Sequence, residues 1–209
     1  MSYVGQILEG LNLTLGVFLL SLALSLPLGV IVAVLRLSKI KIISKITSIY
    51  IWVLRGTPLL LQIMVVFFGL PTIGINLGRF NSIIFAFVLN YAAYFGEIFR
   101  SGIQSIEKGQ REAASILGFS PLQINVKIIL PQVVKRTLPS IGNEVISLIK
   151  DTSLVYAVGQ SDILKFAKGI AVRDATLLPY VIAGCIYLIL TYVITKVFEA
   201  IEKKVAYDE

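Results

Sequence analysis

The sequence predicts an all-α integral membrane protein that forms one domain over residues 1–209, with five membrane-spanning helices. The first observation is composition: 56% of the residues are hydrophobic and 15% are charged, with a mean hydropathy of +0.87, values that a soluble domain rarely shows. The second is the length of the uncharged runs, because a helix needs about 20 apolar residues to cross a bilayer. Four such runs cover residues 10–35, 56–78, 80–96 and 175–195.

The first span is expected to remain in the protein as a helix. Residues 1–10 lack the basic region of a signal peptide, and the apolar run that follows is too long for one. The second span begins after Arg55, and Thr57 and Pro58 are expected to start or kink it. We interpret Arg55 as a cation that extends towards the cytoplasmic surface at the entry of this span, the alternative being direct contact with a solute.

The fourth span, residues 138–158, is apolar in bulk but contains Glu144, Lys150 and Asp151. Pro139 and Gly142 favour a break in this helix, where free carbonyl groups could line a cavity. The remaining uncharged runs supply the third and fifth spans.

The distribution of basic residues predicts the orientation of these spans. An odd number of spans places the two termini on opposite sides, and the cytoplasmic side carries the excess of Lys and Arg. One side has four basic residues, Arg79, Lys165, Lys168 and Arg173. The other has thirteen: Arg36, Lys39, Lys41, Lys45, Arg100, Lys108, Arg111, Lys127, Lys135, Arg136, Lys196, Lys203 and Lys204. The N-terminus is therefore expected outside and the C-terminus in the cytoplasm.

Composition also excludes several classes of function. The net charge of +7 is explained by membrane orientation and lipid contact, and there is no soluble basic domain for nucleic acid. The sequence has no histidine and one cysteine, Cys185, which lies inside the last span. We therefore expect no histidine-based catalysis, no disulfide framework and no sulfur-ligated metal site.

The central loop, residues 107–131, is a polar insertion between two apolar runs. A helical pattern covers about 111–117, Gly118 can adopt the left-handed conformation that ends a helix, and Ser120 and Pro121 are typical of the N-cap and first position of a second short helix. Pro131 restrains the chain before the fourth span. The loop also has an apolar side, formed by Ala113, Ala114, Ile116, Leu117 and Phe119, which indicates either docking to a protein or contact with lipid.

The spacing of these loop residues resembles a known motif. Glu112, Ala113, Ala114, Gly118, Ile128, Leu130 and Pro131 resemble the EAA loop in permease subunits of bacterial ATP-binding-cassette (ABC) importers. Residues 55–62 (RGTPLLLQ), 150–159 (KDTSLVYAVG) and 90–106 are similar to the branch that takes up polar amino acids. The resemblance implies a type I importer permease fold whose cytoplasmic coupling helix lies in a cleft of the ATPase. The residues implied to couple to the ATPase are Glu112, Ala113, Ala114, Ile116, Leu117, Gly118 and Phe119.

The same resemblance implies a set of partners in the bacterial cytoplasmic membrane. They are two ABC ATPase subunits, an extracytoplasmic solute-binding protein that delivers an amino acid to loops at about 71–79 and 160–174, and the lipid bilayer. Five spans are too few to enclose a solute path, so a second permease copy or a paralogue is expected. The chain has no Gly-x-x-x-x-Gly-Lys-Ser/Thr pattern, so ATP and Mg are expected on the separate ATPase and no catalytic residue, cofactor or metal on this chain.

Polar residues at membrane depth mark candidate contacts with the solute, because an ionisable group there costs about 2.5–3.5 kcal/mol. Asn90, Tyr94 and Glu97 fall on one face of the third span. The fourth span contributes Glu144, Asp151 and Ser153. A structural alternative pairs Glu97 with Arg100, and Lys150 with Asp151 or Glu144.

The acidic residues of this set favour a cationic solute, so the first expectation is a permease for arginine, lysine or histidine. Glutamine and glutamate remain open because Lys150 can cancel one negative charge. A second hypothesis is an ion-coupled carrier or channel in which Glu144, Lys150 and Asp151 relay protons or ions. That hypothesis does not explain the central loop. A third possibility, a purely structural membrane scaffold, does not explain the polar residues at membrane depth.

Overall fold

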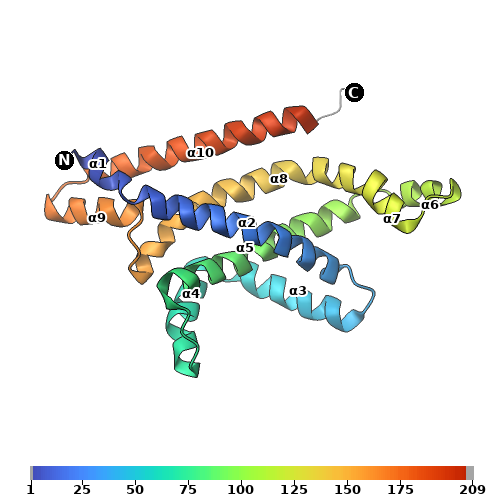
Figure 1. The fold of residues 1–209 in the computed structure, drawn as a ribbon, viewed down its shortest axis with the longest axis horizontal. Coiled ribbons are helices and arrows are strands. Elements are labelled where there is room, and N and C mark those ends of the chain that lie inside the picture. Colours follow the sequence, from blue (N-terminus) through green and yellow to red (C-terminus); the bar gives the residue numbers. More distant parts are fainter. Residues whose placement is uncertain (1, 206–209) are drawn as a thin grey trace.

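The computed structural model describes residues 2–205, which form helices and connecting turns without a strand (Figure 1). The long helices are α2 (Leu11–Arg36), α3 (Lys41–Gly56), α5 (Gly78–Gln104), α8 (Leu130–Asp151) and α10 (Leu178–Val205). The shorter elements are α1 (Tyr3–Leu8), α4 (Leu59–Met64), the π-helical turn η1 (Val65–Gly69), the 3₁₀ turn η2 (Leu70–Ile73), α6 (Lys108–Ile116), α7 (Pro121–Gln123), the π-helical turn η3 (Ile124–Ile129), the 3₁₀ helix η4 (Thr152–Val158) and α9 (Ile163–Arg173).

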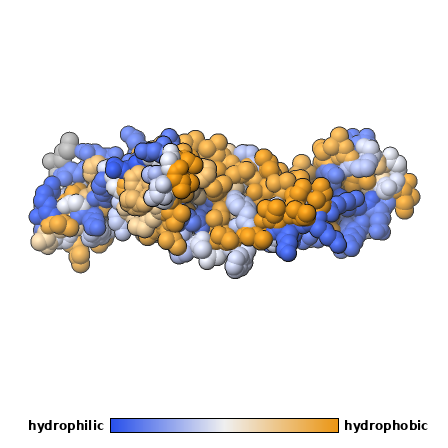
Figure 2. Space-filling model, turned by 90° about the horizontal axis from the view of Figure 1, so that it is seen from below, coloured by the Kyte–Doolittle hydropathy of each residue, from blue (hydrophilic) through white to orange (hydrophobic). Residues whose placement is uncertain are grey.

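The long helices run roughly along one axis of an elongated bundle (Figure 1). On the face seen in Figure 2, hydrophobic residues cover most of the middle of the bundle and hydrophilic residues gather towards its two ends, together with a hydrophobic group at one of them. An apolar middle is expected for a molecule embedded in a bilayer. In the described part of the chain, three segments are long and apolar enough to cross a membrane, namely α1 with α2, α5 and α10, and a fourth is added if the bent pair of α3 and α4 counts as one. The fifth span and the orientation stay predictions, because α8 carries five charged residues.

The centre of the bundle is the close crossing of α2 and α5. A Cβ atom added to Gly29 would lie 2.6 Å from the Cβ of Phe95, and one added to Gly96 would lie 2.5 Å from Cγ1 of Val32. Small residues allow membrane helices to approach closely and gain van der Waals contact. The fully buried Phe87 and Phe95 of α5 then form the main hydrophobic core.

The second span differs from its prediction. Instead of one straight helix over 56–78, the chain forms α3, bends by 106°, and continues as α4, η1 and η2 to Ile73. Thr57 is extended, with φ −122° and ψ 148°, because a residue before proline is disfavoured in the helical region. The predicted break at Thr57 and Pro58 is confirmed, but a further helix, α3, precedes it.

The position of Arg55 is therefore corrected. The sequence placed it at the cytoplasmic entry of the span, whereas α3 carries it inward to the middle of α5, where Tyr50 on α3 donates a 2.6 Å hydrogen bond to the carbonyl of Leu89. Asn90 likewise donates to the carbonyl of Leu54, the residue before Arg55. Two of the basic residues counted on the cytoplasmic side, Lys41 and Lys45, lie in the first turns of this amphipathic helix.

The fourth span is also corrected, because α8 is unbroken at Pro139 and Gly142. Gly142 serves packing: a Cβ there would meet Cδ1 of Phe198 on α10 at 3.0 Å. The second short helix of the central loop is not separate either. Helical turns follow one another from Pro121 through η3 into α8, so Pro131 lies within a continuous rod rather than at a boundary.

Candidate coupling helix and solute site

The short helix α6 lies at the end of the molecule where the central loop turns (Figure 1). Gly118 has φ +82°, the left-handed conformation predicted for it. Ser120 and Gln123 form a capping box, in which the Ser120 Oγ accepts from the Gln123 amide at 3.3 Å and the Gln123 Oε1 accepts from the Ser120 amide at 2.8 Å. The predicted helix end and N-cap are confirmed.

The predicted coupling residues divide between two faces of this loop. Ala114 is buried and packs with Ile106 and Ile124, with Phe119 half-buried against the same cluster. Glu112 and Ala113 are exposed, and Ile116 and Leu117 expose 86% and 76% of their surface. Large apolar side chains exposed together indicate a surface that another molecule covers.

Two hydrogen bonds join α6 to the rod formed by α7, η3 and α8. Gln132 Nε2 donates to Gln110 Oε1 at 2.6 Å, and Arg111 Nη1 donates to Asn125 Oδ1 at 2.9 Å. Because both bonds connect α6 to the same rod, a displacement of α6 is expected to be transmitted along α8.

One of the predicted solute residues, Asn90, lies at the bend between α3 and α4. Asn90 is buried, and its Nδ2 donates to the carbonyl of Leu54 and to Gln62 Oε1, both at 3.0 Å. Gln62 Nε2 in turn donates to the carbonyl of Leu54 at 2.9 Å and to Thr57 Oγ1 at 2.8 Å. Asn90 and Gln62 therefore supply partners for backbone groups that the bend frees.

A group of charged and aromatic side chains lies next to this brace. The Arg55 guanidinium is 5.1 Å from the centre of the Tyr94 ring, which is within the range of a cation–π contact. The charges of Arg55 and Asp151 both act on the half-buried Glu144 carboxylate. Asp151 accepts a 2.7 Å hydrogen bond from the hydroxyl of Tyr91.

Ion pairing distinguishes the acidic residues. Glu97 is bound by Arg100, with Nε to Oε2 at 2.8 Å and Nη2 to Oε1 at 2.5 Å, so the predicted structural pairing is present. Within residues 2–205, no ion pair joins Lys150 to Glu144 or Asp151, or Arg55 to either carboxylate. Ser153 lies half-buried in η4.

Sequence reasoning missed Tyr91 and Gln62 and gave Arg55 a different depth. The amphipathic pattern of residues 41–56 was the signal for the position of Arg55. An amphipathic helix packs its apolar face on the bundle, and Arg55 lies in the last turn of this helix. Tyr91 shows no such signal, since its role depends on Asp151, which is distant in sequence.

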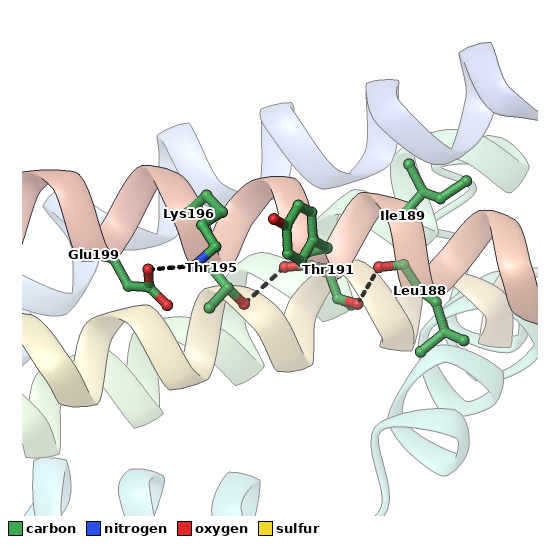
Figure 3. A pocket seen from close by; sticks show the side chains of 7 residues that line it. Leu188, Ile189, Thr191, Thr195, Lys196 and Glu199 are labelled. Carbon is green, nitrogen blue, oxygen red and sulfur yellow. Dashed lines mark hydrogen bonds and ion pairs between the residues drawn. The ribbon is translucent and has the colours of Figure 1, made fainter.

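A groove on α10 is not a solute site. All its lining residues belong to that helix, as Figure 3 shows. The hydroxyl of Thr191 donates to the carbonyl of Leu188 and that of Thr195 to the carbonyl of Thr191. Lys196 pairs with Glu199 at 2.7 Å. These groups are satisfied within one helix and converge on no common point.

Comparison with known proteins identifies relatives over nearly the whole chain. Residues 25–207 match the family model described as binding-protein-dependent transport system inner membrane component. The chain is 38% identical to the arginine transport system permease protein ArtQ of Bacillus subtilis (strain 168), over 95% of this chain and 91% of that protein. It is 35% identical to a putative glutamine transport system permease protein GlnP of Rickettsia conorii, over 95% and 92%.

Solved structures give the same result for the fold. A structure described as an amino acid ABC transporter with histidines has a TM-score of 0.88 and 34% sequence identity, with coverage of 97% of this chain and 95% of that chain. The MetNI methionine ABC transporter in an inward-facing conformation has a TM-score of 0.74 at 20% identity, with coverage of 96% and 94%, which supports the fold alone.

Proposed function

Because the chain belongs to the family of binding-protein-dependent transport system inner membrane components, as an amino acid permease subunit of an ABC transporter, we propose that it carries basic amino acids such as arginine, lysine and histidine. The chain is a multi-pass membrane protein. In the proposed assembly two such permease chains, or this one and a paralogue, enclose the path, and two separate ATPase subunits bind ATP and Mg.

The proposed solute site is the group formed by Arg55, Tyr94, Glu144 and Asp151. An amino acid carries a carboxylate and an ammonium group, which need partners of opposite charge. Arg55 offers the cation and Glu144 the anion, and no ion pair within residues 2–205 joins them. Asp151 adds a second carboxylate, which favours a solute with an additional positive charge.

The observation that carries this proposal is that, within residues 2–205, no ion pair involves Arg55, Glu144 or Asp151. An ionisable group at membrane depth is costly, so one that lacks an oppositely charged partner within the protein suggests a functional role. Asn90, Glu97 and Ser153 are assigned supporting positions in the same region, since Asn90 and Glu97 already have partners in the chain.

The proposed link to ATP hydrolysis is α6. Ile116 and Leu117 present an apolar surface beside Glu112 and Ala113, and a cleft in the ATPase subunit would cover it. Gly118 allows the turn behind the helix, while Ala114 and Phe119 hold it on the permease. Closure of the ATPase pair would then move α6 and α8 and alternate the access of the cavity.

The test is ATP hydrolysis by the purified membrane complex in lipid, measured while arginine, lysine, histidine or glutamine is added together with the solute-binding protein. We expect stimulation by arginine that Glu112→Lys abolishes, since the variant reverses a charge on the docking surface. Glu202→Lys, a charge reversal near the end of α10, is the matched control and should retain stimulation.

Glu144→Gln tests the solute site separately. Its half-saturating arginine concentration should rise about tenfold or more, because a hydrogen bond to a charged group contributes about 1.5–3 kcal/mol, and the exposed Glu107→Gln should leave it unchanged. If glutamine stimulates hydrolysis, and does so equally in the natural chain and in Glu144→Gln, the proposal of a basic substrate is contradicted. Flux that follows a proton gradient without any copurifying ATPase would contradict the importer mechanism itself.

A further inference from the structure

A basic hollow lies where α2 turns into α3. It has a volume of about 360 Å³ and is lined by Arg36, Ser38, Lys41, Ser44, Lys45 and Ser48. Arg36 is fixed by its hydrogen bond from Nη1 to the Ser44 Oγ at 2.8 Å. The lining contains three cations and three hydroxyl groups and no carboxylate, and within residues 2–205 no ion pair involves these cations. Such a hollow has the donors that a phosphate group requires.

An apolar groove begins at the same turn. It has a volume of about 690 Å³ and runs between α2 and the rod of η3 and α8, with α5 behind it. Ser38 lines both the groove and the basic hollow. The apolar lining includes Val30, Val34, Phe99, Ile103, Val133 and Ile141.

The polarity of the groove changes along its length. The polar lining residues Ser38, Arg111 and Asn125 lie by the loops that close this end of the bundle, whereas Val30 and Ile141 lie deeper along their helices. The one polar residue among the deeper lining, Thr137, has its hydroxyl bonded to the carbonyl of Val133 at 2.8 Å. From Asn125 to Ile141 the helix rises about 24 Å at 1.5 Å per residue. One leaflet of a bilayer is about 15 Å of hydrocarbon, so the groove is long enough for one acyl chain.

We propose that the hollow and the groove together bind one anionic phospholipid of the surrounding bilayer, with its phosphate in the hollow and an acyl chain in the groove. Basic pockets between membrane helices are suited to anionic head groups, and the cytoplasmic leaflet supplies such lipids. The predicted orientation places this end of the bundle at that leaflet.

The shared residue favours a lipid over the other occupants. A free phosphate would fill the hollow but leave the groove empty. A helix of a second chain, about 10 Å across, would cover the groove but would not account for the three adjacent cations of the hollow. A phospholipid matches both parts, because its phosphate and its acyl chains belong to one molecule and Ser38 lines both the hollow and the groove.

The test measures lipid binding to the full-length chain, purified in neutral detergent with whatever subunits accompany it and stripped of lipid. Phosphatidylglycerol or phosphatidylcholine with identical acyl chains is titrated, and bound lipid is counted by native mass spectrometry. We expect one phosphatidylglycerol to bind before any phosphatidylcholine. Lys41→Gln with Lys45→Gln should weaken this binding about 25-fold, since each basic residue near an anionic surface contributes about fivefold.

Matched variants separate the site from general charge and from general apolar contact. Lys203→Gln with Lys204→Gln removes the same charge from the end of α10 and should leave binding unchanged. Val34→Trp fills the groove and should reduce lipid binding, whereas Ile31→Trp, an exposed residue on the same helix outside the groove, should not.

Three outcomes would overturn the proposal. The first is equal binding of the two lipids, and the second is an equal loss in the two pairs of lysine variants, which would reduce the effect to net charge. The third is displacement of phosphatidylglycerol by inorganic phosphate alone, with no effect of Val34→Trp.

Discussion

Replacing Asn90 by leucine tests whether this residue braces the bend between α3 and α4. The Nδ2 atom makes two hydrogen bonds, to the Leu54 carbonyl and to Gln62 Oε1, each at 3.0 Å. Hydrogen bonds between membrane helices contribute about 0.6 kcal/mol on average and up to about 1.7 kcal/mol. Asn90→Leu, which keeps the volume similar, should therefore lower the free energy of unfolding by about 1–3 kcal/mol.

The assay is reversible unfolding of the purified chain in mixed micelles, titrated with a denaturing detergent. A double-mutant cycle with Gln62→Leu isolates the bond between the two side chains, and its coupling energy should be about 0.6–1.7 kcal/mol. Gln62 retains a separate role in the cycle, because its Nε2 also donates to Leu54 and Thr57. Asn12→Leu on α2, an exposed position, is the matched control and should not lower stability.

Comparison of Asn90→Leu with Asn12→Leu also defines the result that would refute a bracing role for Asn90. If Asn90→Leu unfolds at the same denaturant concentration as Asn12→Leu while arginine-stimulated ATP hydrolysis is lost, Asn90 does not brace the bend. It would then contact the solute directly, as its position on the third span predicts. Loss of stability with hydrolysis retained in the folded fraction would support the brace.

Two further predictions concern the crossing of α2 with α5 and the N-cap of α9. Gly29→Ala should be less stable than Gly16→Ala by about 1–3 kcal/mol in the same unfolding assay, because both gain helix propensity but only position 29 is overpacked against Phe95; equal stability would refute the close crossing. Asp162→Asn should gain stability relative to the natural chain at neutral pH, since burial raises the pKa of the Asp162 carboxyl although it accepts bonds from the amides of Leu164 and Lys165. The gain should shrink as the pH falls through the raised pKa of the folded state and vanish below the pKa of the unfolded state, because the natural carboxyl is then protonated in both states. A gain that does not depend on pH would refute this account.

The membrane class and the central loop were predictable because their signals are local. Apolar runs identified α2 within one residue at each end and the starts of α5 and α10 within three residues, although these two helices continue beyond the runs to Gln104 and Val205. The helix end at Gly118 and the cap at Ser120 follow from the conformations these residues favour. Such signals depend on a residue and its immediate neighbours. They do not require knowledge of which helices meet.

The bend and the depth of Arg55 were not predictable in the same way. The basic residues from Arg36 to Lys45 have two explanations, either a cytoplasmic connection or the start of an amphipathic helix. The two explanations place Arg55 at different depths. The choice depends on contacts far apart in sequence, between Tyr50 and Leu89 and between Leu54 and Asn90. The continuity of α8 at Pro139 was equally hidden, because the packing of Phe198 on Gly142 supports the helix there.

The two candidate sites are connected by α8, and this connection gives the proposed mechanism a direction. At one end of the rod Asn125 and Gln132 are hydrogen-bonded to α6, and at the other end α8 carries Glu144 and Asp151. Arg55 belongs to α3, which is attached to α5 through the bond between Tyr50 and Leu89. In the proposed importer, a movement of α6 on the ATPase would therefore displace the carboxylates relative to the guanidinium. The charges that hold an amino acid would separate, and the solute would be released without any change in its own chemistry.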